Sequence, residues 1–302
     1  MSDFRPLRLE EIFFNLGKTR LAAFGSRFMD RNQSPTTSFA VALARRLPVS
    51  FKHWVHRHRK LDGIARRLFR AALGEEFLSV EDGPLAGTRL AVSEHISHAH
   101  IRGTYERQVA EAIARLLRSG GVCYDLGASI GYFSLLMART ARLVYCFEPA
   151  PHAAAEIVRN MAANGFDNYR VVTSPVTDSI RQVRFAVTDV AYGSGISERN
   201  ADWPELVLTS TTLDDFIQSH EAPDFVKMDV EGEEDRVLAG CRGLLARRNA
   251  VFLCELHSRE DASQCRALFD EYKYVVTGLD ESPVQWDADA LPGEFHVIAR
   301  PY

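Results

Sequence analysis

The chain has 302 residues, of which 46% are apolar and 25% charged, and its mean hydropathy is -0.16. This composition is typical of one large globular domain with an appendage, or of two domains, and it lacks the biases of disordered, collagen-like or coiled-coil sequences. No apolar run reaches the roughly 18–20 residues that a membrane span requires. The opening residues MSDFRPLRLEEIFF contain no apolar core of a signal peptide, so we expect a soluble protein that stays in the cytoplasm.

The cysteines predict neither disulfides nor a metal site. They form no CxxC pair and show no metal-ligand spacing, and Cys123, Cys146 and Cys254 lie in strongly apolar segments. We interpret them as small buried apolar residues in a reducing compartment.

The net charge of -4 is unevenly distributed along the chain. Residues 1–80 contain 15 Lys and Arg against 7 Asp and Glu, whereas residues 81–302 contain 21 against 33. The segment 51–70 combines apolar residues at helical spacing with many Arg and Lys. It is typical of a helix that binds a membrane surface or nucleic acid, or of a helical cap with a solvated basic face, and we favour the cap.

The residue pattern of the chain changes at the turn-forming run 81–87, EDGPLAG. We therefore expect a basic, helical N-terminal region at 1–84 and a second domain at 85–302. In the second domain, short and almost continuously apolar runs alternate with helical segments. Such strands are typical of a parallel sheet covered on both faces, which predicts an α/β, doubly wound fold. Expected strands are 122–126, 143–147, 170–172, 225–230, 250–256, 274–277 and 295–299, and expected helices are 105–118, 132–139, 153–163, 234–246 and 264–272.

The first of these strands leads into the run YDLGASIGYFS at 124–134. Gly127 and Gly131 let the backbone turn tightly and approach a ligand closely. Ser129 occupies the place of the middle glycine of GxGxxG, which disfavours a dinucleotide. Asp125, just before the glycines, suits an ammonium group better than a phosphate.

A second acid, Glu148, follows the next strand and precedes Pro149. A carboxylate at that place can accept hydrogen bonds from both ribose hydroxyls. Together, Asp125 and Glu148 describe a ligand with an amino-acid head and a ribose but no phosphate, and S-adenosylmethionine fits that description. The alternative is that both are solvated acids at strand ends.

Charged residues also stand at the ends of two later strands. Lys227, Asp229 and Glu231 alternate in the run FVKMDVEG, and Glu255 and His257 end the strand that follows. Charges in an apolar strand are costly unless they are paired or functional. Because these ends should open on the same crevice as the glycine run, we interpret them as functional groups or, alternatively, as a salt-bridged rim.

Six motifs resemble, in order, those of the FkbM-type family of S-adenosylmethionine-dependent methyltransferases: GTYE at 103–106, DLGASIGYFS, FEP, TTLDDF, DFVKMDVEGEE and CELH. The resemblance covers roughly residues 103–260, and Ser129 replaces the Asn more usual in that family. It implies a class I, Rossmann-like methyltransferase fold that converts S-adenosylmethionine to S-adenosylhomocysteine. The residues implied to hold the cofactor are Asp125, Gly127, Ala128, Ser129, Gly131, Tyr132, Phe133, Glu148 and Pro149, with Val176 and Asp178 beside the adenine.

From this resemblance we expect an O-methyltransferase of secondary metabolism that acts on a hydroxyl of a sugar or natural-product small molecule. His257 or Asp229 would serve as the base, and Glu231 and Glu255 would orient the acceptor or the base. Asp229, Glu255 and His257 also suit a divalent ion such as Mg²⁺, although we predict no metal. The stretch 189–204 is either a lid over the acceptor or an idle surface loop.

Two other functions stay open. A macromolecular or lipid-linked acceptor could be held by the basic residues 1–84, although the sequence lacks the Asn-Pro-Pro-aromatic motif of base N-methyltransferases, which argues against nucleic acid. A non-catalytic cofactor-binding protein is the second alternative, and the retention of Asp229 and His257 argues against it. A homo-oligomer also stays open.

Overall fold

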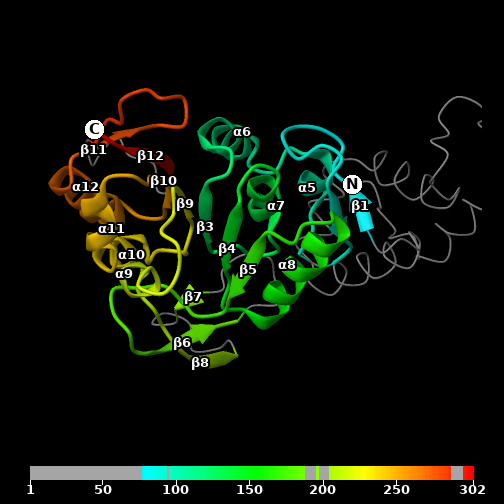
Figure 1. Cartoon of the computed structure of the whole chain (residues 1–302), viewed down its shortest axis with the longest axis horizontal. Coiled ribbons are helices and arrows are strands. Elements are labelled where there is room, and N and C mark those ends of the chain that lie inside the picture. Colours follow the sequence, from blue (N-terminus) through cyan, green and yellow to red (C-terminus); the bar gives the residue numbers. More distant parts are fainter. Residues whose placement is uncertain (1–76, 94, 188–194, 197–203, 287–294) are drawn as a thin grey trace, which may run out of the picture. The chain divides into compact units, whose positions relative to one another are not determined.

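Alternating strands and helices build a seven-stranded sheet in the part of the chain that the structure, a computed structural model, describes (Figure 1). The described residues are 77–93, 95–187, 195–196, 204–286 and 295–302. The chain divides into two units, Met1–Glu75 and Glu76–Tyr302, and every described residue belongs to the second. The basic segment 51–70 lies outside the described residues.

The strands follow the order β11-β12-β10-β9-β3-β4-β5 across the sheet. β3, β4, β5, β9 and β10 run parallel to one another, whereas β12 is antiparallel to both β10 and β11. The expected doubly wound α/β fold is confirmed. Because the chain winds in opposite directions from β3, a crevice opens at the carboxyl ends of β3 and its neighbours. The strands are β3 Val122–Leu126, β4 Leu143–Phe147, β5 Tyr169–Val172, β9 Phe225–Met228, β10 Val251–Leu256, β11 Tyr274–Thr277 and β12 Phe295–Pro301.

Helices cover both faces of this sheet (Figure 1). Side chains alternate along each strand, so that Cys123 packs toward one layer of helices and Tyr124 toward the other. All five cysteines are buried with free thiols, as expected. None of the helices among the described residues combines the length and apolar character needed to cross a membrane. One layer contains α6 Arg107–Leu116, α7 Tyr132–Ala138 and α8 Pro151–Ala163, and the other contains α9 Leu213–Phe216, α10 Glu234–Ala239, α11 Arg242–Arg247 and α12 Arg259–Glu271.

The single helix expected at 234–246 is wrong, because the chain forms α10 and α11 there instead. At Gly240 a side chain would overlap the carbonyl oxygen of Thr177, so a neighbouring segment crosses the helix at this point. The side chain of Asp214 then accepts hydrogen bonds from the backbone N–H groups of Gly243 and Leu244, at 2.7 and 2.8 Å. An acid at this position caps the new helix, which explains why α11 begins here.

The turn-forming run 81–87 connects β1 Phe77–Ser79 to β2 Arg89–Ala91, which pair in antiparallel fashion. The run therefore lies inside the second unit, whose first residue is Glu76. The short helix α5, His98–Arg102, follows β2 and precedes α6.

A small antiparallel sheet of order β7-β6-β8 was not expected from the sequence. It consists of β6 Gln182–Ala186, β7 Gly195–Ile196 and β8 Glu205–Thr209. Phe185 of β6 packs with Ala150 and Ala153 near the start of α8. Most of the stretch 189–204, interpreted as a lid or a loop, lies outside the described residues.

A buried amide connects β2, the glycine run and α8. The Asn160 side chain of α8 is fully buried, accepts a hydrogen bond from Ala91 N at 2.7 Å and donates one to Ile130 O at 2.8 Å. It therefore satisfies one buried backbone donor and one backbone acceptor from two distant segments.

We expect Asn160→Ala to lower the free energy of unfolding by about 2–4 kcal/mol, because each buried backbone group left without a partner costs about 1–3 kcal/mol. Urea denaturation followed by circular dichroism measures this loss. The matched control is Val158→Ala on the exposed side of the same helix, which should change stability by no more than about 0.5 kcal/mol. Equal effects of the two substitutions would contradict the role of Asn160.

Candidate functional site

Two adjoining cavities lie at the carboxyl ends of β3, β4 and β9. Gly127, Ser129, Asp229, Tyr105 and His95 line both of them. Other residues that line the larger cavity are Leu126, Phe147, Glu148, Pro149, Ala150, His152, Ala153, Ser174, Pro175, Val176, Phe185, Gly195, Ile196, Val230, Glu231 and Glu233. Other residues that line the smaller cavity are His100, Ala128, Ile130, Tyr132, Phe133 and Lys227.

The glycine run comes very close to the segment after β9. Gly127 has a φ of +71°, and a Cβ there would overlap the carbonyl oxygen of Asp229. Its own carbonyl oxygen accepts a hydrogen bond from Lys227 Nζ at 3.3 Å. Only glycine meets both demands, because it tolerates positive φ and has no side chain.

Glu148 is a buried carboxylic acid that lines the larger cavity. Its two carboxylate oxygens accept hydrogen bonds from Ser129 N and Ala150 N, each at 2.8 Å. Burial raises the pKa of Glu148 to about 7, although these two backbone hydrogen bonds oppose the shift. A carboxylate oxygen can accept more than one hydrogen bond, so Glu148 can still accept hydrogen bonds from the hydroxyl groups of a ligand in the cavity.

Asp125 lies in neither cavity. It is fully buried at the end of β3, where it accepts a hydrogen bond from Ser134 Oγ and lies 3.7 Å from Lys227 Nζ. The cation that this carboxylate faces in the structure is a lysine of the protein, and its Oδ1 accepts no hydrogen bond from the residues that the structure describes. Contact of Asp125 with a ligand ammonium group stays a prediction.

The other residues assigned to the cofactor divide between the cavities and their surroundings. Val176 is buried and lines the larger cavity, whereas Asp178 lies outside both and pairs with Arg181 at 3.4 Å. Gly131 begins α7, where its φ of +81° and its packing against Ile157 explain the glycine. The structure brings Gly127, Ala128, Ser129, Tyr132, Phe133, Glu148, Pro149 and Val176 to the cavities.

Lys227 is a buried cation between two carboxylates. Its side chain is 4% exposed, and Nζ lies 3.1 Å from Asp229 Oδ2 and 3.7 Å from Asp125 Oδ1. Burial alone would lower the pKa of Lys227, but Asp229, Asp125 and Glu106 outweigh it and raise the pKa. The lysine therefore stays charged and holds the ends of β3 and β9 together.

His257 sits among carboxylates at the end of β10. Its Nδ1 lies 3.1 Å from Glu234 Oε1, and its Nε2 lies 3.7 Å from Asp229 Oδ1 and 3.9 Å from Glu231 Oε2. Burial alone would lower the pKa of His257, but Glu234, Asp229 and Glu255 raise it to about 9. At neutral pH the ring carries a proton on both nitrogens, so in this state it holds the carboxylates and has no lone pair to accept a proton.

Glu255 faces residues that the sequence did not single out as its partners. It is the register partner of His296 across β10 and β12, and the two side chains approach to 3.3 Å. Glu106, just before α6, lies 4.0 Å from the same His296 nitrogen. The sequence placed His296 in an expected strand at 295–299, but it could not show that this strand pairs His296 with Glu255.

The sheet order, the glycine run and the acid after the second strand define a class I, Rossmann-like methyltransferase. Residues 125–276, half of the chain, match the methyltransferase FkbM domain. The chain belongs to the FkbM methyltransferase family, which confirms the resemblance seen in its motifs.

Solved structures of methyltransferases resemble this chain at low identity. Precorrin-6y C5,15-methyltransferase from Geobacter metallireducens is 12% identical, with a TM-score of 0.42 over 70% of this chain and 92% of that chain. Methyltransferase FkbM from Methylobacillus flagellatus is 16% identical, with a TM-score of 0.40 over 68% of this chain and 56% of that chain. No curated protein sequence is significantly similar to this chain. The fold class follows from the strand order and the family, not from these two similarities.

We expect Lys227→Met to lower the free energy of unfolding by about 3–5 kcal/mol, because it leaves Asp125 and Asp229 without their buried cation. Urea denaturation measures the loss. The double variant Lys227→Met/Asp125→Asn should recover part of it, since one uncompensated charge is then removed. Lys273→Met, at an exposed lysine, is the control, and a loss no larger than that of the control would contradict the assignment.

Proposed function

We propose that this methyltransferase transfers the methyl group of S-adenosylmethionine to a hydroxyl of a small molecule, such as a sugar or another natural product. The observation that carries the proposal is Glu148, a buried carboxylate that lines the larger cavity where a ribose-binding acid is needed. A carboxylate at this place accepts hydrogen bonds from hydroxyl groups and repels phosphate groups. It therefore favours a nucleoside ligand over a nucleotide.

The residues of the two cavities fit the parts of such a cofactor. Glu148 would accept the ribose hydroxyls, and the apolar surfaces of Val176 and Phe185 would contact the adenine. The amino-acid head would lie against the glycine run in the smaller cavity. When bound, S-adenosylmethionine supplies an electrophilic methyl group on a positively charged sulfur.

Asp229 is the residue that we assign to the acceptor. It lines both cavities, so its carboxylate can accept a hydrogen bond from a hydroxyl placed between them. In such a transfer the bond from the hydroxyl oxygen to the methyl carbon would form as the methyl–sulfur bond breaks and S-adenosylhomocysteine leaves. The hydroxyl would become more acidic, and a carboxylate in contact with it would take its proton. The protein's other main contribution to the reaction is to align the hydroxyl oxygen with the methyl group, and a fixed hydrogen-bond acceptor provides this alignment.

The neighbouring charged residues keep Asp229 in place. Lys227 donates a hydrogen bond to it at 3.1 Å, and the His257 imidazolium lies between Asp229 and Glu231. Of the two bases considered from the sequence, we therefore retain Asp229 and assign His257 as a positioning residue. Glu231 lines the larger cavity and would orient the acceptor.

We expect S-adenosylmethionine to bind the purified full-length protein in the micromolar range by isothermal titration calorimetry, with no binding of NAD⁺. We also expect 5′-methylthioadenosine, which has the same ribose but no titrating amine, to bind about tenfold more weakly at pH 6 than at pH 8. The reason is that only ionised Glu148 accepts both hydroxyls, and its pKa of about 7 lies between these values.

Glu148→Gln should weaken 5′-methylthioadenosine binding at pH 8 and remove its pH dependence. The matched control Glu221→Gln replaces an exposed carboxylate that pairs with Arg142, and it should leave the pH dependence unchanged. Wild-type affinity that is constant from pH 6 to pH 8 would contradict the ribose role of Glu148, and absence of S-adenosylmethionine binding would contradict the proposed cofactor.

A further inference from the structure

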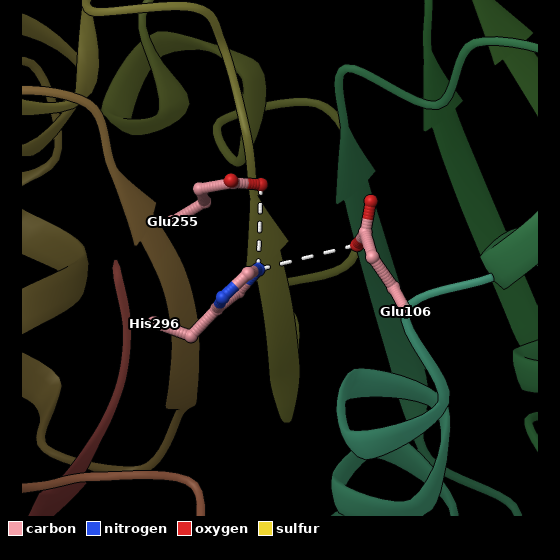
Figure 2. A group of neighbouring side chains, drawn as sticks. All are labelled: Glu106, Glu255 and His296. Carbon is pink, nitrogen blue, oxygen red and sulfur yellow. Dashed lines mark ion pairs between the residues drawn. The ribbon is translucent and has the colours of Figure 1, made fainter. Parts of the chain in front are cut away.

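Three side chains from separate elements meet, as Figure 2 shows: Glu106 before α6, Glu255 on β10 and His296 on β12. His296 Nε2 lies 3.3 Å from Glu255 Oε2 and 4.0 Å from Glu106 Oε2. One ligand atom from each side chain lies within 4.8 Å of those of the other two. The three groups therefore converge on a single point.

These separations are close to those of ligands around one metal ion. Oxygen and nitrogen ligands bind Zn²⁺ at about 2.0–2.2 Å, so neighbouring ligand atoms lie about 2.8–3.1 Å apart in octahedral geometry and about 3.3–3.6 Å apart in tetrahedral geometry. The distance of 3.3 Å between His296 Nε2 and Glu255 Oε2 falls in this range, whereas Glu106 Oε2, at 4.0 Å from the same nitrogen, would have to move closer to bind the same ion. Glu255 and His296 are also register partners across β10 and β12, which keeps both on one face of the sheet.

Glu106 has an oxygen that the protein leaves without a hydrogen bond. Its Oε2 is shielded from solvent and has no hydrogen-bond partner among the residues that the structure describes. The residue occupies the N-cap position of α6, yet its side chain makes no capping hydrogen bond and points instead toward His296 (Figure 2). A shielded carboxylate oxygen without a partner is costly unless a cation completes it.

Negative charge exceeds positive charge around this point. Glu106, Glu255 and Asp229 are accompanied by Glu231 and Glu234, whereas the basic side chains besides His296 among the described neighbours are Lys227 and His257. Both cations are already engaged, since Lys227 lies between Asp125 and Asp229 and His257 between Glu234 and Asp229. A further cation would compensate the excess at Glu106 and Glu255.

The set Asp229, Glu255 and His257 also converges, but it suits a metal less well. Its Asp229 is neutralised by Lys227 at 3.1 Å, and its His257 is bonded to Glu234 through Nδ1. In the set of Glu106, Glu255 and His296, by contrast, Glu106 Oε2 accepts no hydrogen bond from any residue that the structure describes.

We propose that Glu106, Glu255 and His296 bind a divalent transition-metal ion. Two carboxylates and one imidazole form a mixed oxygen and nitrogen donor set, which suits ions from Mn²⁺ to Zn²⁺ better than Ca²⁺. Three protein ligands leave coordination positions for water or a substrate oxygen.

The role of the ion rests on the function proposed above. Because Glu255 lies within 4.8 Å of Asp229, an acceptor bound to Asp229 would have an oxygen close to the ion. An ion that coordinates this oxygen would lower the pKa of the hydroxyl, so that its proton could pass to Asp229.

The test is direct binding of Mn²⁺ to the full-length protein after removal of metals with a chelator, with free Mn²⁺ measured by electron paramagnetic resonance. We expect one saturable site per chain with micromolar affinity. Glu106→Gln, Glu255→Gln and His296→Gln should each weaken it at least tenfold, while circular dichroism confirms that each variant is folded. Zn²⁺ should displace the bound Mn²⁺.

Glu111→Gln is the matched control, because Glu111 lies on α6 but pairs with Arg107 at the surface, and it should bind Mn²⁺ as the wild type does. The proposal is overturned by absence of saturable binding, or by binding that survives Glu106→Gln and His296→Gln but is lost in Asp229→Asn. Since no cofactor or acceptor is present, a negative result leaves the binding of S-adenosylmethionine to be judged by its own titration.

Discussion

The site depends on one buried cation, Lys227. Its charge is stable only because Asp125 and Asp229 flank it, and those carboxylates are tolerated inside the sheet only because the lysine is there. The same amine donates to the carbonyl oxygen of Gly127. One side chain thus fixes the end of β3, the glycine run and the segment after β9, and Gly127 and Asp229 of these segments line both cavities.

A row of charged residues extends from this lysine across one face of the sheet. Strand alternation and register place Asp125, Lys227, Glu255 and His296 on the face that also packs against α6 and α7. At the edge of the sheet formed by the carboxyl ends of β3, β9 and β10 and the amino end of β12, this face has charged side chains. Over the rest of the same face, β3, β9 and β10 have apolar side chains. The consequence is a strongly acidic rim beside the cavities, where His257 is held as a cation and cannot act as the simple base that its position first indicated.

Much of the fold was predictable because each element carries its own local signal. The strands at 122–126, 143–147 and 274–277 have the expected bounds. Short apolar runs bordered by turn residues can be recognised as strands from the local sequence alone. The division between α10 and α11 was not predictable, because its cause is the approach of Thr177 and the cap from Asp214, both distant in sequence. The β6–β7–β8 sheet was missed for a similar reason: short strands in a polar stretch have little periodicity of their own.

The sequence by itself determined the α/β class, the family and the residues around the glycine run, because glycines, a strand-end acid such as Glu148 and continuous apolar strands act locally. Tertiary structure decided what the charges do. Pairing with Lys227 turns Asp125 inward, contact with Glu234 keeps His257 protonated, and the register of β10 and β12 brings His296 to Glu255 and toward Glu106. Electrostatic roles depend on distances between residues far apart in the chain, and those distances exist only once the sheet has formed.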